Sequence, residues 1–231
     1  MQVAILFSGG KDSAHATKYC IDSGFEIKSL ISVKPRNEEA YIWHYPTVEL
    51  CKLSAEAMQL PITLIRCDEI GPQVEAKCLE PLLAKLKADA LVLGGVGLQH
   101  TQIREVTKIA EKFDMDVLLP HKNYTSEQLL AEEIESGLEI VITEVAADGL
   151  GKEWLGRIIE KNAFSALKKL GDKHGFDILG EGGSFNTFVT DAPFFKQRID
   201  FVNPAIVWDE KTRSGYVVTD AMLVEKMAVK V

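Results

Sequence analysis

The sequence has few cysteines, and their arrangement excludes two common kinds of small structural site. Four cysteines occur in 231 residues, at Cys20, Cys51, Cys67 and Cys78, and no two of them form a CxxC pair. Their separations fit neither a zinc site nor a disulfide-rich scaffold. We therefore expect buried free thiols in a reducing, cytoplasmic compartment.

The sequence also lacks long apolar runs and an excess of basic residues. The first apolar run ends at Phe7, which is too short for a signal peptide, and no run approaches the length of a membrane span. Lysine and arginine number 26 against 34 aspartates and glutamates, a net charge of −8. Nucleic acids are held through clustered basic residues, so we expect neither a membrane nor a nucleic-acid partner. The sequence leaves the oligomeric state open, a homo-oligomer included.

Apolar runs and helical patterns alternate over the first 120 residues. Strands are expected at 3–7, 28–33, 62–65, 90–93 and 116–119. Helices are expected after the first strand up to Gly24, from Pro46 to Met58, from Pro72 onward, and around 103–113. In the third of these helices, the apolar face is expected to consist of Val74, Cys78, Leu82 and Leu86. Such alternation calls for a parallel sheet that is covered on both faces.

The pattern changes after Pro120. Thr125 and Gln128 form a capping box that predicts a helix ending near Gly137. A strand at 139–145, helices at 152–160 and 162–173, and strands at 185–191, 195–202 and 216–224 follow. The fold class is therefore α/β, with an N-terminal parallel-sheet, Rossmann-like domain at 1–122 and a C-terminal α+β domain at 123–231. The acidic run from Glu132 to Glu135 is expected to be a solvated helix face.

A motif between the first strand and the first helix is shaped for an anion. It reads Ser8, Gly9, Gly10, Lys11, Asp12 and Ser13. Small residues expose backbone N–H groups there, and the start of a helix adds a positive dipole end. Lys11 adds a charge, and Asp12 is explained if it holds Mg²⁺ or caps the helix. The spacing matches neither the GxxxxGK[ST] phosphate loop nor the GxGxxG dinucleotide motif.

This SGGKDS hexapeptide resembles the signature of the PP-loop, or N-type, ATP pyrophosphatases. The resemblance implies an adenine nucleotide α-hydrolase-like fold, ATP with Mg²⁺ as cofactors, and cleavage between the α- and β-phosphates. Residues expected at the nucleotide by resemblance or by their place at strand ends are Ile31, Ser32, Val33, Gly94 and Gly95. Lys11 and Asp12 are the expected catalytic residues of this half.

A second motif, from Gly180 to Val189, places three glycines around Glu181. With Asp191-Ala192-Pro193 and Leu155-Gly156-Arg157, it resembles the diphthine–ammonia ligase family, and the resemblance spans most of the chain. The implied reaction is amidation of diphthine on elongation factor 2 with ammonia, either free or supplied by a partner. Glu181 is the expected residue for orienting the acceptor or deprotonating ammonium. The expected acceptor-binding residues are His44, Arg104, Gly182, Gly183, Thr187 and Asp191. This chain departs from the family pattern at Ser184-Phe185-Asn186, which bears on the acceptor and not on ATP.

Two other functions fit the same N-terminal motif. A PP-loop enzyme of tRNA thiolation or lysidine formation would share the adenylation step, and a basic patch in the folded protein would favour it. A non-catalytic nucleotide sensor would share the scaffold but form no AMP and pyrophosphate. The acidic balance argues against the first, and the Lys11-Asp12 pair argues against the second.

Overall fold

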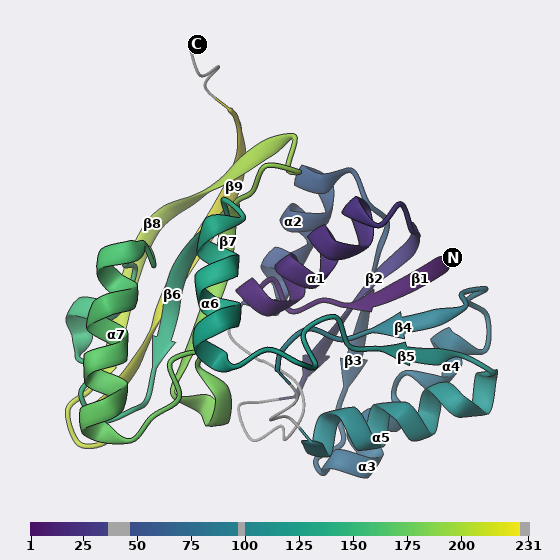
Figure 1. Ribbon diagram of the computed structural model, residues 1–231, viewed down its shortest axis with the longest axis horizontal. Coiled ribbons are helices and arrows are strands. Elements are labelled where there is room, and N and C mark those ends of the chain that lie inside the picture. Colours follow the sequence, from purple (N-terminus) through teal and green to yellow (C-terminus); the bar gives the residue numbers. More distant parts are fainter. Residues whose placement is uncertain (37–46, 97–99, 227–231) are drawn as a thin grey trace.

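A five-stranded parallel sheet forms the first half of the protein (Figure 1). The structure is a computed structural model that describes residues 1–36, 47–96 and 100–226. The strands are β1 (Gln2–Leu6), β2 (Glu26–Pro35), β3 (Ile62–Cys67), β4 (Ala90–Val92) and β5 (Asp116–Leu118), in the order β3-β2-β1-β4-β5. The strand order reverses between β1 and β4, and open α/β sheets bind their ligands at such a switch point.

Helices cover both faces of this sheet. They are α1 (Lys11–Asp22), α2 (Cys51–Met58), α3 (Pro72–Lys77), α4 (Glu80–Leu83) and α5 (His100–Ala110), with short 3-10 turns η1 (Val48–Leu50) and η2 (Glu111–Phe113). Successive residues of β1 enter two different clusters: Val3 and Ile5 pack on the side of α1 and α2, and Ala4 and Leu6 on the side of α3 to α5. The Rossmann-like expectation is therefore confirmed.

The helix expected from Pro72 is in fact two helices, and its expected apolar face holds only in part: Cys78, Leu82 and Leu86 pack partly buried against the core, and Val74 does not. The chain breaks between α3 and α4 because Pro81, which has no N–H to donate, stands in the first turn of α4. The break turns Leu79 and Leu83 inward, each no more than 1% exposed, and leaves Val74 36% exposed.

An antiparallel sheet forms the second half, in the order β7-β6-β9-β8. Its strands are β6 (Glu139–Val145), β7 (Phe185–Asp191), β8 (Gln197–Asp209) and β9 (Ser214–Glu225). The helices are α6 (Ser126–Glu135) and α7 (Lys161–His174), with 3-10 turns η3 (Lys152–Trp154) and η4 (Glu181–Gly183). The α+β expectation is confirmed, and so is the capping box: the Gln128 N–H donates to Thr125 Oγ1 at 3.2 Å, and the Thr125 N–H donates to Gln128 Oε1 at 3.0 Å.

Some expected boundaries in both halves are wrong. The helix expected at 152–160 is only the turn η3, because the backbone becomes extended at Leu155 and Gly156 has a φ of +79°. Ile158 then bridges Val141 of β6. Strand β2 is longer than expected, so Ile31, Ser32 and Val33 lie inside it and not at its end. Strand β8 extends well past residue 202 because β9 pairs with it along almost its whole length.

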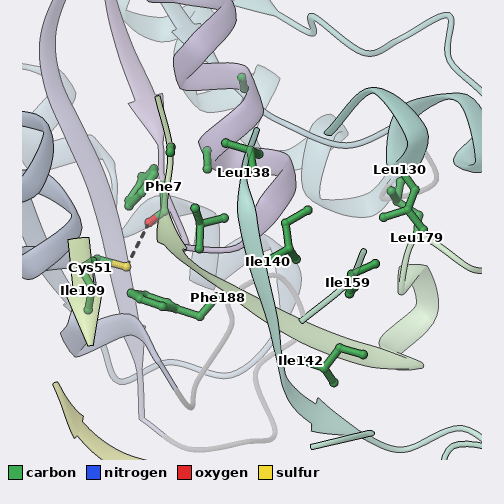
Figure 2. Close-up of a cluster of buried hydrophobic side chains, with 14 of the residues drawn as sticks. Phe7, Cys51, Leu130, Leu138, Ile140, Ile142, Ile159, Leu179, Phe188 and Ile199 are labelled. Atoms are coloured by element: carbon green, nitrogen blue, oxygen red, sulfur yellow. Dashed lines mark hydrogen bonds between the residues drawn. The ribbon is translucent and has the colours of Figure 1, made fainter. Parts of the chain in front are cut away.

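One hydrophobic cluster runs through both halves (Figure 2). Phe188 of β7 lies beside Cys51 and Phe7 of the first half, and Ile140 of β6 belongs to the same cluster. The backbone is shared as well, because the Val189 N–H of β7 donates to the Gly9 carbonyl at 2.9 Å. The division at residues 122 and 123 stays a prediction, and this shared cluster fixes how the halves meet.

The cysteines are free, as expected, and three of the four are buried. Burial raises the pKa of Cys51 to about 12, and it does the same for Cys20. Neither is a thiolate at neutral pH, so neither is a nucleophile. In the described part of the chain, no helix is both long enough and apolar enough to cross a bilayer.

Candidate active site

The anion motif leaves β1 and turns tightly against β7. Gly9 has a φ of +80°, and a Cβ atom there would lie 2.6 Å from Cε2 of Phe188. Gly10 is the residue before the first turn of α1, and a Cβ on it would lie 3.2 Å from the Thr187 carbonyl oxygen. Both glycines are therefore required by the close approach of the two halves, in addition to the shape of the turn.

Three backbone N–H groups of the motif donate to hydroxyl groups and are not exposed as expected. The Ser8 N–H donates to Ser13 Oγ at 3.2 Å, and the Gly10 N–H donates to Ser8 Oγ at 3.3 Å. The Lys11 N–H donates to Oγ1 of Thr187, on β7, at 3.2 Å. Because hydroxyl groups sit on rotatable side chains, a phosphate oxygen can replace each of them without moving the backbone.

Lys11 is a buried cation held between the two halves. Its side chain is 4% exposed, and Nζ donates to Asp12 Oδ2 at 2.9 Å and to the Leu179 carbonyl at 2.5 Å. Burial by itself lowers the pKa of Lys11, but the carboxyl groups of Asp12, Glu133 and Glu181 outweigh it and raise that pKa. The ammonium is therefore charged at neutral pH, as a phosphate-binding lysine must be.

The expectation of a solvated acidic face holds for Glu132 and Glu135, which are exposed, but is wrong for Glu133. It is 0% exposed, and neither carboxyl oxygen receives a hydrogen bond from a donor in the described residues. Helix α6 stands against α1 (Figure 1). Glu133 of α6 lies near Asp12 and Lys11, because both of these charges act on its pKa. Burial, followed by the nearby Asp12 carboxyl, raises the pKa of Glu133 well above its ordinary value, against the effect of Lys11.

A single pocket joins the two sequence motifs. Its walls come from the turn after β1, from Thr47, and from the segment that leads into β7. The lining residues are Ser8, Gly10, Lys11, Asp12, Thr47, Leu179, Gly180, Glu181, Phe185, Asn186 and Thr187. Gly182 and Gly183 do not line it, and a Cβ on either would meet no atom within 4 Å. Asn186, which lines the pocket, donates from Nδ2 to Glu144 Oε2 at 2.5 Å.

The loop after β4 packs directly on the first turn of α1. A Cβ on Gly94 would lie 2.5 Å from the Asp12 carbonyl oxygen, so only glycine fits. Gly95 has a φ of +92°, and its N–H donates to Nδ1 of His121 at 3.1 Å. The segments that follow β1 and β4, the two strands at the switch point, are thus in backbone contact. A single ligand can therefore contact both segments.

The segment Ile31 to Val33 continues β2 beyond the end of β1. The Phe7 N–H donates to the Ile31 carbonyl at 2.8 Å, and Ser32 Oγ donates to the Phe7 carbonyl at 2.6 Å. Peptides of a strand face its two neighbours alternately. The Val33 peptide therefore faces the same side as the Ile31 carbonyl, above the end of β1, and the Ser32 peptide faces β3.

Besides Gly182 and Gly183, the expected acceptor-binding residues Arg104 and Asp191 do not line this pocket, and a fifth is outside the described residues. Arg104 is 61% exposed, and its Nε donates to Glu105 at 2.8 Å. Asp191 pairs with Lys226 at 2.6 Å and accepts from the Ala192 N–H. It lies at the opposite end of β7 from Phe185, about 20 Å away at the rise of a strand. His44 falls in the segment that the structure does not describe.

Asp12 fits the expected magnesium ion in one respect. Its Oδ1 atom is buried and receives no hydrogen bond from the described residues, which leaves one carboxylate oxygen for a cation. Magnesium commonly takes one or two carboxylates together with phosphate oxygens and water. The described residues contain no group of three or more His, Cys, Asp or Glu placed to hold a metal, so a cation here needs ligands from the phosphates.

We expect Gly9→Ala to destabilise the protein more than Gly182→Ala. Both glycines have positive φ, +80° and +75°, so both substitutions carry a similar backbone cost of about 1–2 kcal/mol. Only the alanine at position 9 also collides with Phe188, which adds about 1–3 kcal/mol of overpacking. Urea unfolding of the two variants measures the difference, and equal losses would show that the turn is not packed against β7.

Family comparisons match both halves of the chain. A model of the diphthamide synthase N-terminal domain matches residues 1–117, and a model of the diphthamide synthase C-terminal domain matches residues 125–224. A human protein named diphthine–ammonia ligase is 32% identical over 221 residues, covering 86% of this chain and 82% of the human protein. The Danio rerio protein of the same name is 30% identical over 220 residues, covering 86% of each.

A longer relative and one solved structure are also similar. The diphthine–ammonia ligase of Schizosaccharomyces pombe is 27% identical over 248 residues, covering 98% of this chain but 40% of the yeast protein. The crystal structure of a predicted subunit of tRNA methyltransferase from Methanocaldococcus jannaschii aligns with a TM-score of 0.49 at 16% identity, over 84% of this chain and 98% of that one.

Proposed function

This chain belongs to the diphthamide synthase family, and from that premise we propose that it is an ATP-dependent ligase that adenylates a carboxylate and amidates it with ammonia. The proposed acceptor is the diphthine carboxylate on elongation factor 2. The observation that carries the proposal is the pocket in which Lys11 and Asp12 of the first half meet Glu181 and Asn186 of the second.

The reaction has two balanced steps. An acceptor carboxylate oxygen attacks the α-phosphorus of ATP, the bond to the β-phosphate oxygen breaks, and pyrophosphate leaves. Ammonia then attacks the carbonyl carbon of the acyl adenylate, AMP leaves with the attacking oxygen, and one proton is released. The residues act on the first step by placing the two reactants and by neutralising the charge that develops on the leaving pyrophosphate.

The residues of the first half take the phosphate end. Lys11 donates to a phosphate oxygen in place of the Leu179 carbonyl, and the hydroxyl-bound amides of the turn become available as Ser8 and Thr187 rotate. Asp12 would hold a magnesium ion through Oδ1, and that ion would supply further charge neutralisation at the phosphates. The Val33 peptide and the Gly94–Gly95 turn are placed for the nucleoside and its first phosphate.

Glu181 takes the acceptor end. It lines the pocket and is close enough to Lys11 to affect its pKa, so it lies near the phosphate-binding cation. A carboxylate at this position can accept a proton from ammonium or from attacking ammonia, and it can orient a positively charged acceptor. The pair of Glu144 and Asn186 stands beside it on β6 and β7.

We expect the protein to convert ATP to AMP and pyrophosphate only when both acceptor and ammonium are present. The test incubates it with ATP, Mg²⁺, ammonium and elongation factor 2 that carries diphthine, and follows nucleotides by chromatography and the acceptor by mass spectrometry. Stoichiometric ADP and phosphate would contradict the reaction class. AMP formation with no amide on this acceptor would leave the adenylation but overturn the assignment of elongation factor 2.

We expect Glu181→Gln to spare ATP binding and to slow amide formation by about ten-fold or more, as for loss of a general base. Calorimetric titration with ATP measures the first effect, and the amidation assay measures the second. Asp177→Asn is a matched control on the same segment, because Asp177 accepts from Ser126 and the Leu179 N–H and does not line the pocket. Normal amidation by Glu181→Gln would make Glu181 a loop residue only.

A further inference from the structure

Two buried histidines connect the loop after β4 to helices α1 and α6. The Gly95 N–H donates to Nδ1 of His121 at 3.1 Å, and Nε2 of His121 lies 3.0 Å from Nδ1 of His15. His121 follows β5, and His15 is on α1; they are 2% and 7% exposed. Nε2 of His15 points to Glu132 of α6 at 3.8 Å. A chain of polar contacts, Gly95–His121–His15–Glu132, thus links the loops after β4 and β5 to helices α1 and α6.

The direction of donation along this line is fixed by the first bond. A backbone N–H can only donate, so Nδ1 of His121 must be an acceptor without a proton. A neutral His121 then carries its proton on Nε2 and donates to Nδ1 of His15. His15 in turn carries its proton on Nε2, toward the Glu132 carboxylate. Only this one arrangement of protons satisfies every contact with both rings neutral.

The surroundings keep both rings neutral. Burial lowers the pKa of His121 to about 4, with a smaller effect from His15, and burial also lowers the pKa of His15 against the pull of Glu132. The edge of Tyr124 meets the His121 ring, and a hydrogen bond to Glu132 raises the pKa of Tyr124. The charged groups that act on the two rings are Lys11, Asp12, Lys18 and Asp22 of α1 and Glu132 of α6.

We propose that His121, held by His15, is a positioning residue for the nucleotide: it accepts the Gly95 N–H and so fixes the Gly94–Gly95 turn against the first turn of α1. The inference rests on the proposed function, in which this turn contacts ATP. It assigns a role to two histidines that lie behind the pocket and do not line it. Because Gly95 has positive φ and Gly94 touches the Asp12 carbonyl, releasing the N–H frees the turn to rotate away from the phosphate site.

The arrangement makes the turn sensitive to one added proton. Protonation of His121 at Nδ1 puts a second donor opposite the Gly95 N–H, so the hydrogen bond between them is lost. A proton on His15 reverses the tautomer of His121 and has the same result, because Nδ1 of His15 can no longer accept. The Gly94–Gly95 turn therefore keeps its position only while His15 and His121 are both neutral. Nucleotide affinity falls at acid pH, where one of the two histidines binds a proton.

The experiment compares His121→Asn with His121→Leu. Asparagine places Oδ1 near the position of Nδ1, so it accepts the Gly95 N–H but does not titrate; leucine fills the space without an acceptor. We expect His121→Leu to raise the KM for ATP about ten-fold with kcat changed less than about two-fold, and His121→Asn to restore most of the loss. His174→Leu, at an exposed histidine on α7, is the control and should match the wild type.

A second measurement reads the hydrogen bond without ATP. We expect the Gly95 amide to exchange with solvent about ten-fold faster in His121→Leu than in the wild type, and at a nearly wild-type rate in His121→Asn. Equal exchange in all three proteins, or no rescue by asparagine, overturns the proposal. Failure of the wild type to bind ATP would instead overturn the proposed function, and the exchange rates would still decide the role of His121. If His121→Leu does not fold, His15→Leu takes its place, which removes the acceptor for Nε2 of His121 and the contact with Glu132.

Discussion

Replacing Lys11 with methionine is expected to lower kcat/KM for ATP by about 100-fold, which corresponds to about 2.7 kcal/mol of transition-state stabilisation. The ammonium is 4% exposed and lines the pocket beside Asp12, so no solvent cation can take its place. Methionine has a similar length and keeps the packing against Phe185, whose ring centre lies 5.8 Å from Nζ. Steady-state AMP formation measures the loss.

Folding must be measured with this variant, because removing the cation leaves buried carboxyl groups without their counter-charge. Lys18→Met is a matched control on the same helix, since Lys18 is partly exposed and pairs with Asp22 one turn away. The control should keep wild-type turnover. A folded Lys11→Met protein that forms AMP at the normal rate would remove the turn after β1 from the mechanism.

Replacing Glu133 with glutamine is expected to raise the free energy of unfolding at pH 7, because a buried carboxyl whose pKa is raised costs stability above its ordinary pKa. The raised pKa means that the folded protein binds a proton at Glu133 more tightly than the unfolded chain does. Folding must therefore take up a proton, and stability falls as pH rises above the ordinary carboxyl pKa. Glutamine is neutral at every pH and carries no such cost.

The pH dependence separates this explanation from simple repacking. The advantage of Glu133→Gln should shrink as pH falls toward 4.5, where the glutamate of the unfolded chain is itself protonated. Urea unfolding at pH 7 and at pH 4.5 measures both values. Glu135→Gln on the exposed side of the same helix is the control and should change stability little at either pH. An advantage that is the same at both pH values would contradict a protonated Glu133.

The parts of the site that are local in sequence could be predicted. The turn after β1 follows from the strand, the glycines and the helix that are adjacent in the chain, and Gly94–Gly95 follows from its place at a strand end. Glu133 could not be found in this way, because an acidic run on a helix is usually solvated. Only the packing of α6 on α1 turns one member of that run toward Lys11.

The same reason explains why some expected acceptor residues lie outside the pocket. Asp191 is close in sequence to Glu181 and Thr187, but β7 is extended and carries it to the far end of the sheet, where Lys226 pairs with it. His15 and His121 carry no sequence signal of their contact, since 106 positions separate them. The sequence pattern predicts which residues belong to the same strand or helix. Which of their side chains are in contact depends on the tertiary packing of those elements.

Oxygen transfer tests the central claim, that an acceptor carboxylate attacks the α-phosphorus of ATP in this pocket, most directly. The measurement uses an acceptor whose carboxylate is labelled with ¹⁸O and follows the label by mass spectrometry after one turnover with ATP and ammonium. We expect one ¹⁸O atom in AMP, because the attacking oxygen stays on phosphorus when ammonia displaces AMP. Label in inorganic phosphate with unlabelled AMP, or label retained wholly in the product amide and solvent, would contradict the adenylation.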